Sequence, residues 1–402
     1  MEIMIKFEIK KIFSKTINKL ALLLLVLLIL VGAFLTVKDV TYVNENGQTL
    51  SGLSASKYLR NEKNEWKGDL DSKILSEIID KNNKINAAQS DEDKAFIEKQ
   101  GMEDILQIIN ESLAGFGEYD YYGVDNIDSN TVSDIYEQRI QTLKDYLNTS
   151  DNFTKNEKEY LIEQYQNLNT PLYYEYADGW KALLGSQFLP TLMIIITVVL
   201  GFLVSGIFSD EFIYKADSIF FSTRFGRNKA ILSKIAAGLI TTTSMYWCSV
   251  ILYSLLVLTI LGFDGAECMI QTSFGNWFSM YNITYLQEWF LTMFGGYIGL
   301  LFILILAMLV SAKTRSTVFA ITIPFALSCA PMFLGRIEIL SRAMTLFPDM
   351  LLRISTNLGE FVLYELGGYV IDILGILIPL YSILSILLLP ILFYVYRKTE
   401  IR

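Results

Sequence analysis

The sequence contains no histidine and only three cysteines among its 402 residues. Without histidine, the chain lacks the side chain that most often moves protons or binds metals at neutral pH. The spacing of Cys248, Cys268 and Cys329 predicts neither a disulfide framework nor a metal site. The chain also lacks the G-x-x-x-x-G-K-[ST] pattern of a nucleotide-phosphate loop. We therefore expect that this chain contains no catalytic residue, cofactor or metal and that it is not an enzyme.

Charged residues are scarce as well, at 19% of the chain, whereas soluble domains usually carry about 25%. The apolar residues gather in long runs, and a bilayer core about 30 Å thick needs roughly 20 apolar residues per helix. Asp372, at a boundary, is the one charged residue in these runs. The sequence therefore predicts a mainly α polytopic membrane protein with six transmembrane helices, at 20–37, 188–208, 235–262, 290–311, 317–334 and 372–395.

The first apolar run follows a basic start, so it could also be a signal peptide. A signal peptide has a shorter apolar core and ends at a small-residue cleavage site. Here the apolar run continues to Lys38 without such a site. We therefore interpret it as an uncleaved first span.

Basic residues mark the loops that stay in the cytoplasm. Segments 1–19, 209–234, 312–316 and 396–402 together carry 15 basic and six acidic residues, whereas segment 263–289 carries no basic residue. Six spans with this charge distribution place both termini in the cytoplasm of a bacterial cell. Within 1–19, Ile3, Phe7 and Phe13 recur at helical spacing, which favours an amphipathic helix on the inner leaflet over an unstructured basic tail.

Residues 38–187 form the one polar insertion of domain size, with 15 basic and 28 acidic residues. Apolar residues recur there at helical intervals, as with Ile74, Leu75, Ile78 and Ile79. We expect a largely helical extracytoplasmic domain between spans one and two, with an irregular or β entry. Its acidity suits either attraction of a cationic peptide or an ordinary solvated surface.

Two further segments flank the predicted spans on the outer side. Aromatic residues precede the second span, where amphipathic rings favour the headgroup layer, and they predict interfacial anchors at Tyr173, Tyr174, Tyr176 and Trp180. Segment 335–371 is half apolar, but its runs are too short to cross a membrane. We expect a pair of short interfacial or re-entrant helices there, packed on protein.

The basic loop 209–234 mixes aromatic and charged residues in the stretch SDEFIYKADSIFFSTRFGRNKAILSK. A loop that only fixed topology would need its basic residues but not Phe220 and Phe221 beside Arg224. Exposed clusters of aromatic residues and arginine are typical of protein-binding surfaces. The alternative is that Phe220 and Phe221 merely pack beneath the spans.

This loop resembles the coupling-helix loop of type-2 ATP-binding-cassette (ABC) transporter permeases. The resemblance is carried by Glu211, Ile219-Phe220-Phe221, Ser222-Thr223, Gly226-Arg227 and Lys234. It extends to the six spans, the N-terminal amphipathic helix and the short helices between spans five and six. The chain departs from the family at 215–217, where a Gly-Thr or Gly-x-Asp is frequent, and lacks the frequent proline before the arginine.

The resemblance implies that the loop docks on a separate cytosolic ATPase, which would bind ATP and Mg²⁺. Two ATPases and a second permease, identical or homologous, would complete the unit. The expected coupling residues are Glu211, Tyr214, Phe220, Phe221, Arg224, Arg227, Lys229 and Lys234.

The function implied is that of a permease subunit of a bacterial ABC exporter in the plasma membrane, for an amphipathic peptide, antibiotic or lipid. The alternative is a non-transporting scaffold or receptor that captures a ligand through its acidic extracytoplasmic domain. No nucleic-acid partner is expected.

Overall fold

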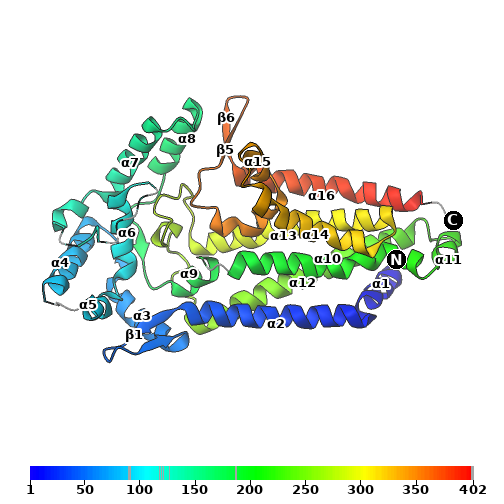
Figure 1. The fold of residues 1–402 in the computed structure, drawn as a ribbon, viewed down its shortest axis with the longest axis horizontal. Helices are drawn as coiled ribbons and strands as arrows, with labels where there is room; N and C mark the ends of the chain where they lie inside the picture. Colours follow the sequence, from blue (N-terminus) through cyan, green and yellow to red (C-terminus); the bar gives the residue numbers. More distant parts are fainter. Residues whose placement is uncertain are drawn as a thin grey trace.

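The computed structural model describes residues 1–88, 92–116, 118, 120, 122–125, 127–185 and 188–399, and within them the chain is mainly helical. Figure 1 shows an elongated molecule with long helices side by side in one half and shorter helices in the other. Both termini lie at the end of the long helices that is remote from the shorter ones. We call these two parts the helix bundle and the polar region.

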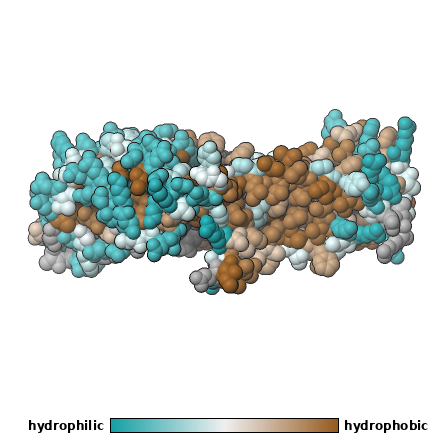
Figure 2. Space-filling model, turned by 90° about the horizontal axis from the view of Figure 1, so that it is seen from above, coloured by the Kyte–Doolittle hydropathy of each residue, from teal (hydrophilic) through white to brown (hydrophobic). Residues whose placement is uncertain are grey.

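Five helices in the described residues are long and apolar enough to cross a membrane. They are α2 (Thr16–Asp39), α10 (Phe188–Ile213), α12 (Lys229–Leu261), α13 (Tyr285–Thr314) and α16 (Ile373–Arg397). A further apolar helix, α14 (Thr317–Leu334), is shorter and contains Pro324 and Pro331. Figure 2 shows hydrophobic side chains gathered over the bundle, between polar surfaces at its two ends. This distribution is that of a helical membrane protein.

Helices α10 and α13 form the centre of the bundle, where they pack on each other and on α14. Side chains such as Leu200 and Ile303 have no exposed surface there. The ends of the helices follow from local chemistry. Thr284 and Gln287 form a capping box at the start of α13, and the Asp372 carboxylate accepts backbone N–H groups at the start of α16.

The N-terminal segment is divided into two helices rather than one. Helix α1 (Glu2–Ser14) ends before Lys15, whose backbone is extended, and α2 begins at Thr16 instead of at residue 20. The Asn18 amide donates to the Ile12 carbonyl oxygen at 2.8 Å, which satisfies a free carbonyl at the end of α1. The bend turns α1 back toward the bundle (Figure 1).

The polar region is built mainly from amphipathic helices, as its sequence pattern predicts. Leu75, Ile78 and Ile79 are all fully buried on α4. The entry is a β-hairpin followed by α3. The elements are β1 (Thr41–Val43), β2 (Thr49–Ser51), α3 (Leu53–Lys63), η1 (Asn64–Trp66), β3 (Gly68–Asp69), α4 (Ser72–Ala88), α5 (Glu92–Lys99), α6 (Glu103–Ala114), η2 (Ser129–Val132), α7 (Ile135–Thr149), α8 (Lys155–Gln166), β4 (Tyr173–Tyr174) and α9 (Asp178–Gly185).

The loop between α12 and α13, which contains η3 (Ile270–Thr272), closes the polar region against the bundle. Trp277 is completely buried there, and the Arg139 guanidinium lies 4.6 Å from the centre of its ring. The Glu111 carboxylate accepts the backbone N–H groups of Gly275 and Trp277 at 2.7 and 3.2 Å. A loop distant in sequence therefore completes the core of the polar region.

Segment 335–371 contains two short helices and a hairpin. The helices are α15 (Glu338–Met344) and η4 (Pro348–Thr356), and η4 packs on α13 with Leu351 and Ile354 fully buried. Strands β5 (Leu363–Leu366) and β6 (Tyr369–Asp372) pair antiparallel through a Gly367-Gly368 turn. The sequence pattern predicts the short helices but not this hairpin. Glu365 of the hairpin accepts hydrogen bonds from Thr154, the N-cap of α8, and from Asn156 within α8.

A buried charge cluster joins the polar region to the helix that leads into α10. Lys63 of α3 lies 3.0 Å from Asp104 of α6 and 2.6 Å from Asp178 of α9, and Lys181 lies 2.9 Å from Asp104. Burial alone would raise the pKa of the Asp104 carboxyl, but Lys181 and Lys63 outweigh it and hold that pKa well below its usual range. We call these four residues the junction cluster.

The junction cluster generates a prediction about acid stability. Asp104→Asn should lower the free energy of unfolding at pH 7 by about 3 kcal/mol or more, because two lysines lose a buried partner. A carboxyl with a depressed folded-state pKa stabilises above its unfolded pKa of about 3.9 and loses that contribution as pH falls. The difference between wild type and variant should therefore shrink below about pH 4.

The measurement is denaturant unfolding of the purified full chain in detergent from pH 7 down to pH 3. The matched control is Asp69→Asn, which removes an exposed carboxylate from β3 and should leave the free energy of unfolding nearly unchanged. A difference for Asp104→Asn that stays constant across this range would contradict the assignment.

Candidate functional site: an ion-pair cluster behind a short projecting helix

The connection between α10 and α12 lies at the end of the bundle that carries both termini (Figure 1). Helix α10 continues through Asp210 and Glu211 to Ile213, so these acidic residues do not begin a new helix. Lys215 then adopts a left-handed backbone with φ of 55°, and the short helix α11 (Asp217–Ser222) follows. The sequence analysis places Glu211 in a loop, whereas the structure places it inside the last turn of α10.

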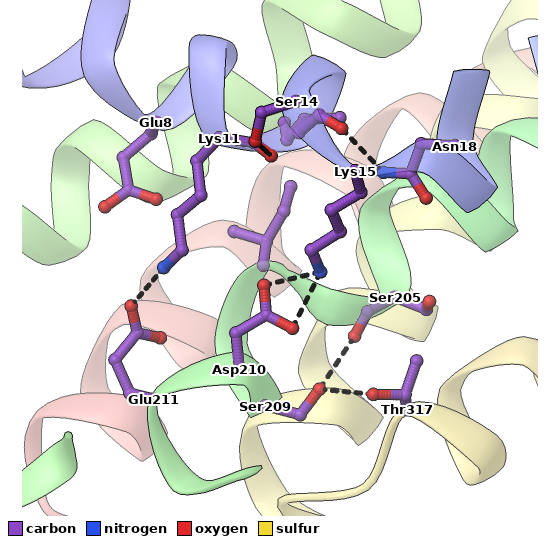
Figure 3. Close-up of polar contacts among 12 residues, drawn as sticks. Glu8, Lys11, Ser14, Lys15, Asn18, Ser205, Ser209, Asp210, Glu211 and Thr317 are labelled. Atoms are coloured by element: carbon purple, nitrogen blue, oxygen red, sulfur yellow. Dashed lines mark hydrogen bonds and ion pairs between the residues drawn. The ribbon is translucent and has the colours of Figure 1, made fainter. Parts of the chain in front are cut away.

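Six charged side chains meet behind this connection, three carboxylates and three ammonium groups. Figure 3 shows all of them except Lys234. They come from α1, α10 and α12, and Lys15 comes from the α1–α2 bend. We call them the ion-pair cluster: Glu8, Lys11, Lys15, Asp210, Glu211 and Lys234. Because the charges balance, the cluster can be buried without leaving a net charge in the apolar core.

Lys234 is the most deeply buried member, with no exposed surface. Its ammonium group lies 2.8 Å from the Glu211 carboxylate, 3.1 Å from Glu8 and 3.0 Å from the Ile207 carbonyl oxygen. An ammonium group has three N–H donors, so these three acceptors satisfy it completely. Lys234 therefore holds α12 against α10 and α1 at once.

Glu211 is shared between two lysines, because Lys11 of α1 also lies 2.6 Å from the same oxygen. Burial lowers the pKa of Lys11, but the hydrogen bond to Glu211 and the neighbouring carboxylates outweigh it, so that pKa lies above its ordinary value. Lys11 is therefore charged at neutral pH. The pair ties the N-terminal helix to the end of α10.

The second half of the cluster pairs Lys15 with Asp210 at 2.6 Å. Gly206 makes this approach possible, because a Cβ atom there would lie 2.6 Å from the Lys15 nitrogen. One turn away, the Ser209 hydroxyl contacts the Thr317 hydroxyl at 2.9 Å, at the start of α14 (Figure 3). Polar contacts thus connect the end of α10 to α1 and to α14.

An aromatic group around Tyr396 of α16 packs on α11 and adjoins the ion-pair cluster, because Lys234 lies 5.3 Å from the centre of the Phe220 ring. The Tyr396 ring lies 5.3 Å from Phe221, 6.1 Å from Phe220 and 4.8 Å from Phe208, measured between ring centres. Phe221 is buried and Phe220 is partly buried. Arg227 lies over the Phe221 ring at 4.9 Å and donates a hydrogen bond to the Arg397 carbonyl oxygen. Helix α11 is therefore fixed to the C-terminal end of α16.

The surface that α11 and its flanking turns expose is different from the one expected. Tyr214, Ile219 and Phe225 have 68%, 69% and 43% of their surface exposed. The Phe225 ring lies between two cations, with Arg224 at 5.5 Å and Lys229 at 4.9 Å from its centre. We call Tyr214, Ile219, Arg224, Phe225 and Lys229 the exposed patch.

The expected coupling residues therefore divide into two sets. Tyr214, Arg224 and Lys229 lie on the exposed patch, together with Ile219 and Phe225, which are not among the expected coupling residues. Phe221, Glu211 and Lys234 are buried, and Phe220 and Arg227 are partly buried, so all five support the connection from behind. Packing of Phe220 and Phe221 beneath the helices is the alternative left open by the sequence, and their burial favours it.

The residues expected to anchor the chain in lipid headgroups lie inside the protein. Tyr174 and Tyr176 have no exposed surface and Trp180 only 5%. The Tyr176 hydroxyl donates to the Leu261 carbonyl oxygen, and the Trp180 indole donates to that of Phe263. Tyr173 is partly buried and donates to Glu175. Buried rings cannot contact headgroups; Tyr176 and Trp180 instead join the start of α9 to the end of α12, and Tyr174 donates to Asp104 of α6.

The ion-pair cluster offers no arrangement suited to covalent or metal chemistry. Its carboxylates are each paired with a lysine, and the part of the chain that the structure describes contains no group of three or more metal-ligating side chains. What the arrangement provides is a firm attachment for the exposed patch. Together with Tyr396 of α16, it attaches a small exposed surface to α1, α10, α12 and α16.

The buried ion pairs of Glu211 generate a prediction about stability. Glu211→Gln should lower the free energy of unfolding by about 3–5 kcal/mol, because Lys234 stays buried with one carboxylate fewer. Glu2→Gln is the matched control, since its ion pair with Lys6 on α1 is exposed and should contribute less than about 1 kcal/mol. Thermal and denaturant unfolding of the purified protein in detergent measures both. Equal effects of the two substitutions would contradict the structural role of Glu211.

Comparison with other proteins assigns no family to this arrangement. No protein-family model, no curated protein and no solved structure matches the chain.

Proposed function

We propose that this chain is the membrane-spanning permease subunit of a bacterial ABC exporter. In this proposal a separate cytosolic ATPase binds ATP and Mg²⁺, and its closure drives export of an amphipathic substrate such as a peptide, antibiotic or lipid. Two ATPase subunits and a second permease complete the transporter. The chain contributes the path through the membrane and the contact with the ATPase.

The observation that carries the proposal is the exposed patch on a firmly held short helix. A surface with Ile219, Phe225 and Arg224 exposed together has the aromatic and arginine content of protein-binding hot spots. It is supported from behind by buried ion pairs and by the ring of Tyr396. A docking element that transmits force needs both an exposed contact and a rigid attachment.

The arrangement of the bundle is compatible with this role. We infer that α14 is the sixth span, beside the five longer helices. An even number of spans returns the chain to its starting side, and both termini lie at the end that carries α1 and α11 (Figure 1). That end holds the basic segments, which the positive-inside rule assigns to the cytoplasm. The polar region would then be extracytoplasmic and the membrane the bacterial plasma membrane.

The contacts of α11 suggest how a push on the exposed patch would reach the helices. Phe221 transmits it to α16 through Tyr396, while Glu211 links α10 to α12 through Lys234. Lys11 and Glu8 connect the same point to α1. Movement of α11 would therefore shift several helix ends together, as alternating access requires.

The first test is the composition of the native complex. The tagged chain is purified in mild detergent from its host, with gentle crosslinking, and its partners are identified by mass spectrometry. We expect a stoichiometric subunit that carries a nucleotide-phosphate loop. Repeated recovery without any ATPase would overturn the proposal in favour of a membrane scaffold.

The second test locates the contact. Ile219→Ala combined with Arg224→Ala should reduce recovery of the ATPase at least about tenfold, because hot-spot residues each contribute about 2 kcal/mol or more. Asn228→Ala is the control, since this exposed side chain lies outside the patch and, although Asn228 is the N-cap residue of α12, its side chain makes no capping hydrogen bond. Undiminished recovery with the double variant, folded as judged by its melting temperature, would exclude this surface.

A further inference from the structure

A cavity of about 240 Å³ opens in the polar region, far in the fold from the ion-pair cluster. Helices α4, α5 and α6 and the segment 122–125 line it. Asn82, Asn110 and Leu106 are buried lining residues, while Phe96, Glu92 and Tyr122 are exposed ones. The cavity therefore has a closed floor and a mouth that is open to solvent.

Two buried amide oxygens at the floor have no hydrogen-bond partner among the residues that the structure describes. Asn82 is fully buried and Asn110 is 3% exposed, and the Oδ1 atom of each is unpaired. The orientation of Asn82 is fixed, because its amide nitrogen donates to the Val124 carbonyl oxygen at 3.1 Å. A buried acceptor without a donor costs about 1–3 kcal/mol, so a bound group that donates a hydrogen bond there would be stabilised.

The charges around the cavity favour a ligand that is a cation as well as a hydrogen-bond donor. Glu92, Glu103 and Asp125 line it together with one lysine, Lys99, which lies 3.5 Å from Asp125. Asp125 also accepts a hydrogen bond from Asn86 at 2.8 Å, so it is already engaged. Glu92 and Glu103 are the carboxylates left for a ligand, and both are exposed. A cation entering the mouth would meet a negative potential.

The rest of the wall is apolar or aromatic. Ala95, Leu106 and Val124 are buried beside the floor, and the rings of Phe96 and Tyr122 lie nearer the mouth. Aromatic rings bind ammonium groups through their negative faces and also cover apolar surface. The volume is below that of a drug-sized site, which is about 300–1,000 Å³, so the occupant is a small molecule or a single side chain.

We propose that this cavity binds a primary ammonium group carried on a small apolar body. The ammonium donates to Asn82 and Asn110 and is neutralised by the rim carboxylates, while the apolar body packs on Phe96 and Leu106. Free amines and the lysine side chain of a peptide share this chemistry. The binding does not depend on the proposed export function, because it requires neither the ATPase nor a second permease.

Two other ligand classes fit less well. An anion would face unpaired acceptors and an acidic rim. A metal ion would need several oxygen ligands at short range, and no cluster of three or more carboxylate, cysteine or histidine side chains occurs among the described residues. Calcium is nevertheless included in the test as a competing outcome.

The test uses phenethylamine as the probe, with phenethyl alcohol and phenylacetate as matched neutral and anionic compounds. Isothermal titration calorimetry on the purified full chain in detergent at pH 7 should give a Kd on the order of 1 mM or tighter for the amine. The alcohol and the acid should bind at least about tenfold more weakly, because neither offers a charged donor. Similar binding of all three compounds would overturn the proposal.

Variants separate the cavity from partitioning into the detergent. Asn110→Leu keeps the volume but removes an acceptor, and it should weaken amine binding about tenfold or more. Glu92→Gln changes only an exposed rim charge, so it should fold normally and weaken binding a few-fold, with less effect at high salt. Asn152→Leu, in an exposed turn outside the cavity, is the control and should bind like wild type.

Three further outcomes decide whether the cavity binds an ammonium group and from which source. If Asn110→Leu misfolds, Glu92→Gln decides alone, and an unchanged Kd with that variant overturns the proposal. Binding of calcium chloride to wild type that Asn110→Leu abolishes would replace the ammonium by a metal ion. A peptide with a single lysine, compared with its acetyl-lysine form, then distinguishes a peptide ligand from a free amine as the source of the ammonium group. Preference for the unmodified peptide over phenethylamine indicates a peptide ligand, and the reverse a free amine.

Discussion

The Glu211 carboxylate lies between the ammonium groups of Lys11 and Lys234, and the relative positions of three helices depend on this contact. Lys234 is fully buried, so its charge must be paired where it lies. One residue earlier in α10, the Asp210 carboxylate forms an ion pair with Lys15. The cluster thereby sets how α1, α10 and α12 meet, and through α10 it sets where α11 begins.

Buried ion pairs of this kind contribute more to placement than to net stability. Removing two charges from water costs several kcal/mol per ion, and their attraction offsets that cost only when the geometry is good. A rotation of α10 by one residue would carry Glu211 away from Lys234 and leave a charge unpaired in an apolar core. Apolar packing between long helices tolerates such slips far better. The charges therefore give the end of the bundle a single arrangement, which a docking surface needs.

The polar region is attached to the bundle by a second group of buried charges, the junction cluster of Lys63, Asp104, Asp178 and Lys181. The two clusters lie at opposite ends of the bundle and both satisfy lysines with carboxylates from other helices. Between them the surface of the bundle is largely hydrophobic, as the belt in Figure 2 shows. The chain thus places clusters of paired buried charges at both ends of the bundle, where polar segments are held against apolar helices.

The sequence by itself determined the positions of the long helices, because runs of apolar residues must be buried in protein or lipid wherever they occur. It also determined the helical character of the polar region, since stripes such as Leu75, Ile78 and Ile79 reflect a local period. It could have revealed the β5–β6 hairpin through Gly367-Gly368, a turn signal that the apolar content of the segment obscured.

Only the tertiary structure decided which charges pair, because Lys11 meets Glu211, Lys15 meets Asp210 and Glu8 meets Lys234 across about two hundred residues of chain. It also decided that Phe221, Tyr174 and Tyr176 face the interior while Ile219 and Phe225 face solvent. An aromatic residue in a short connection carries no periodic signal, so its side is fixed by whichever distant helix packs on it. Here that helix is α16, through Tyr396.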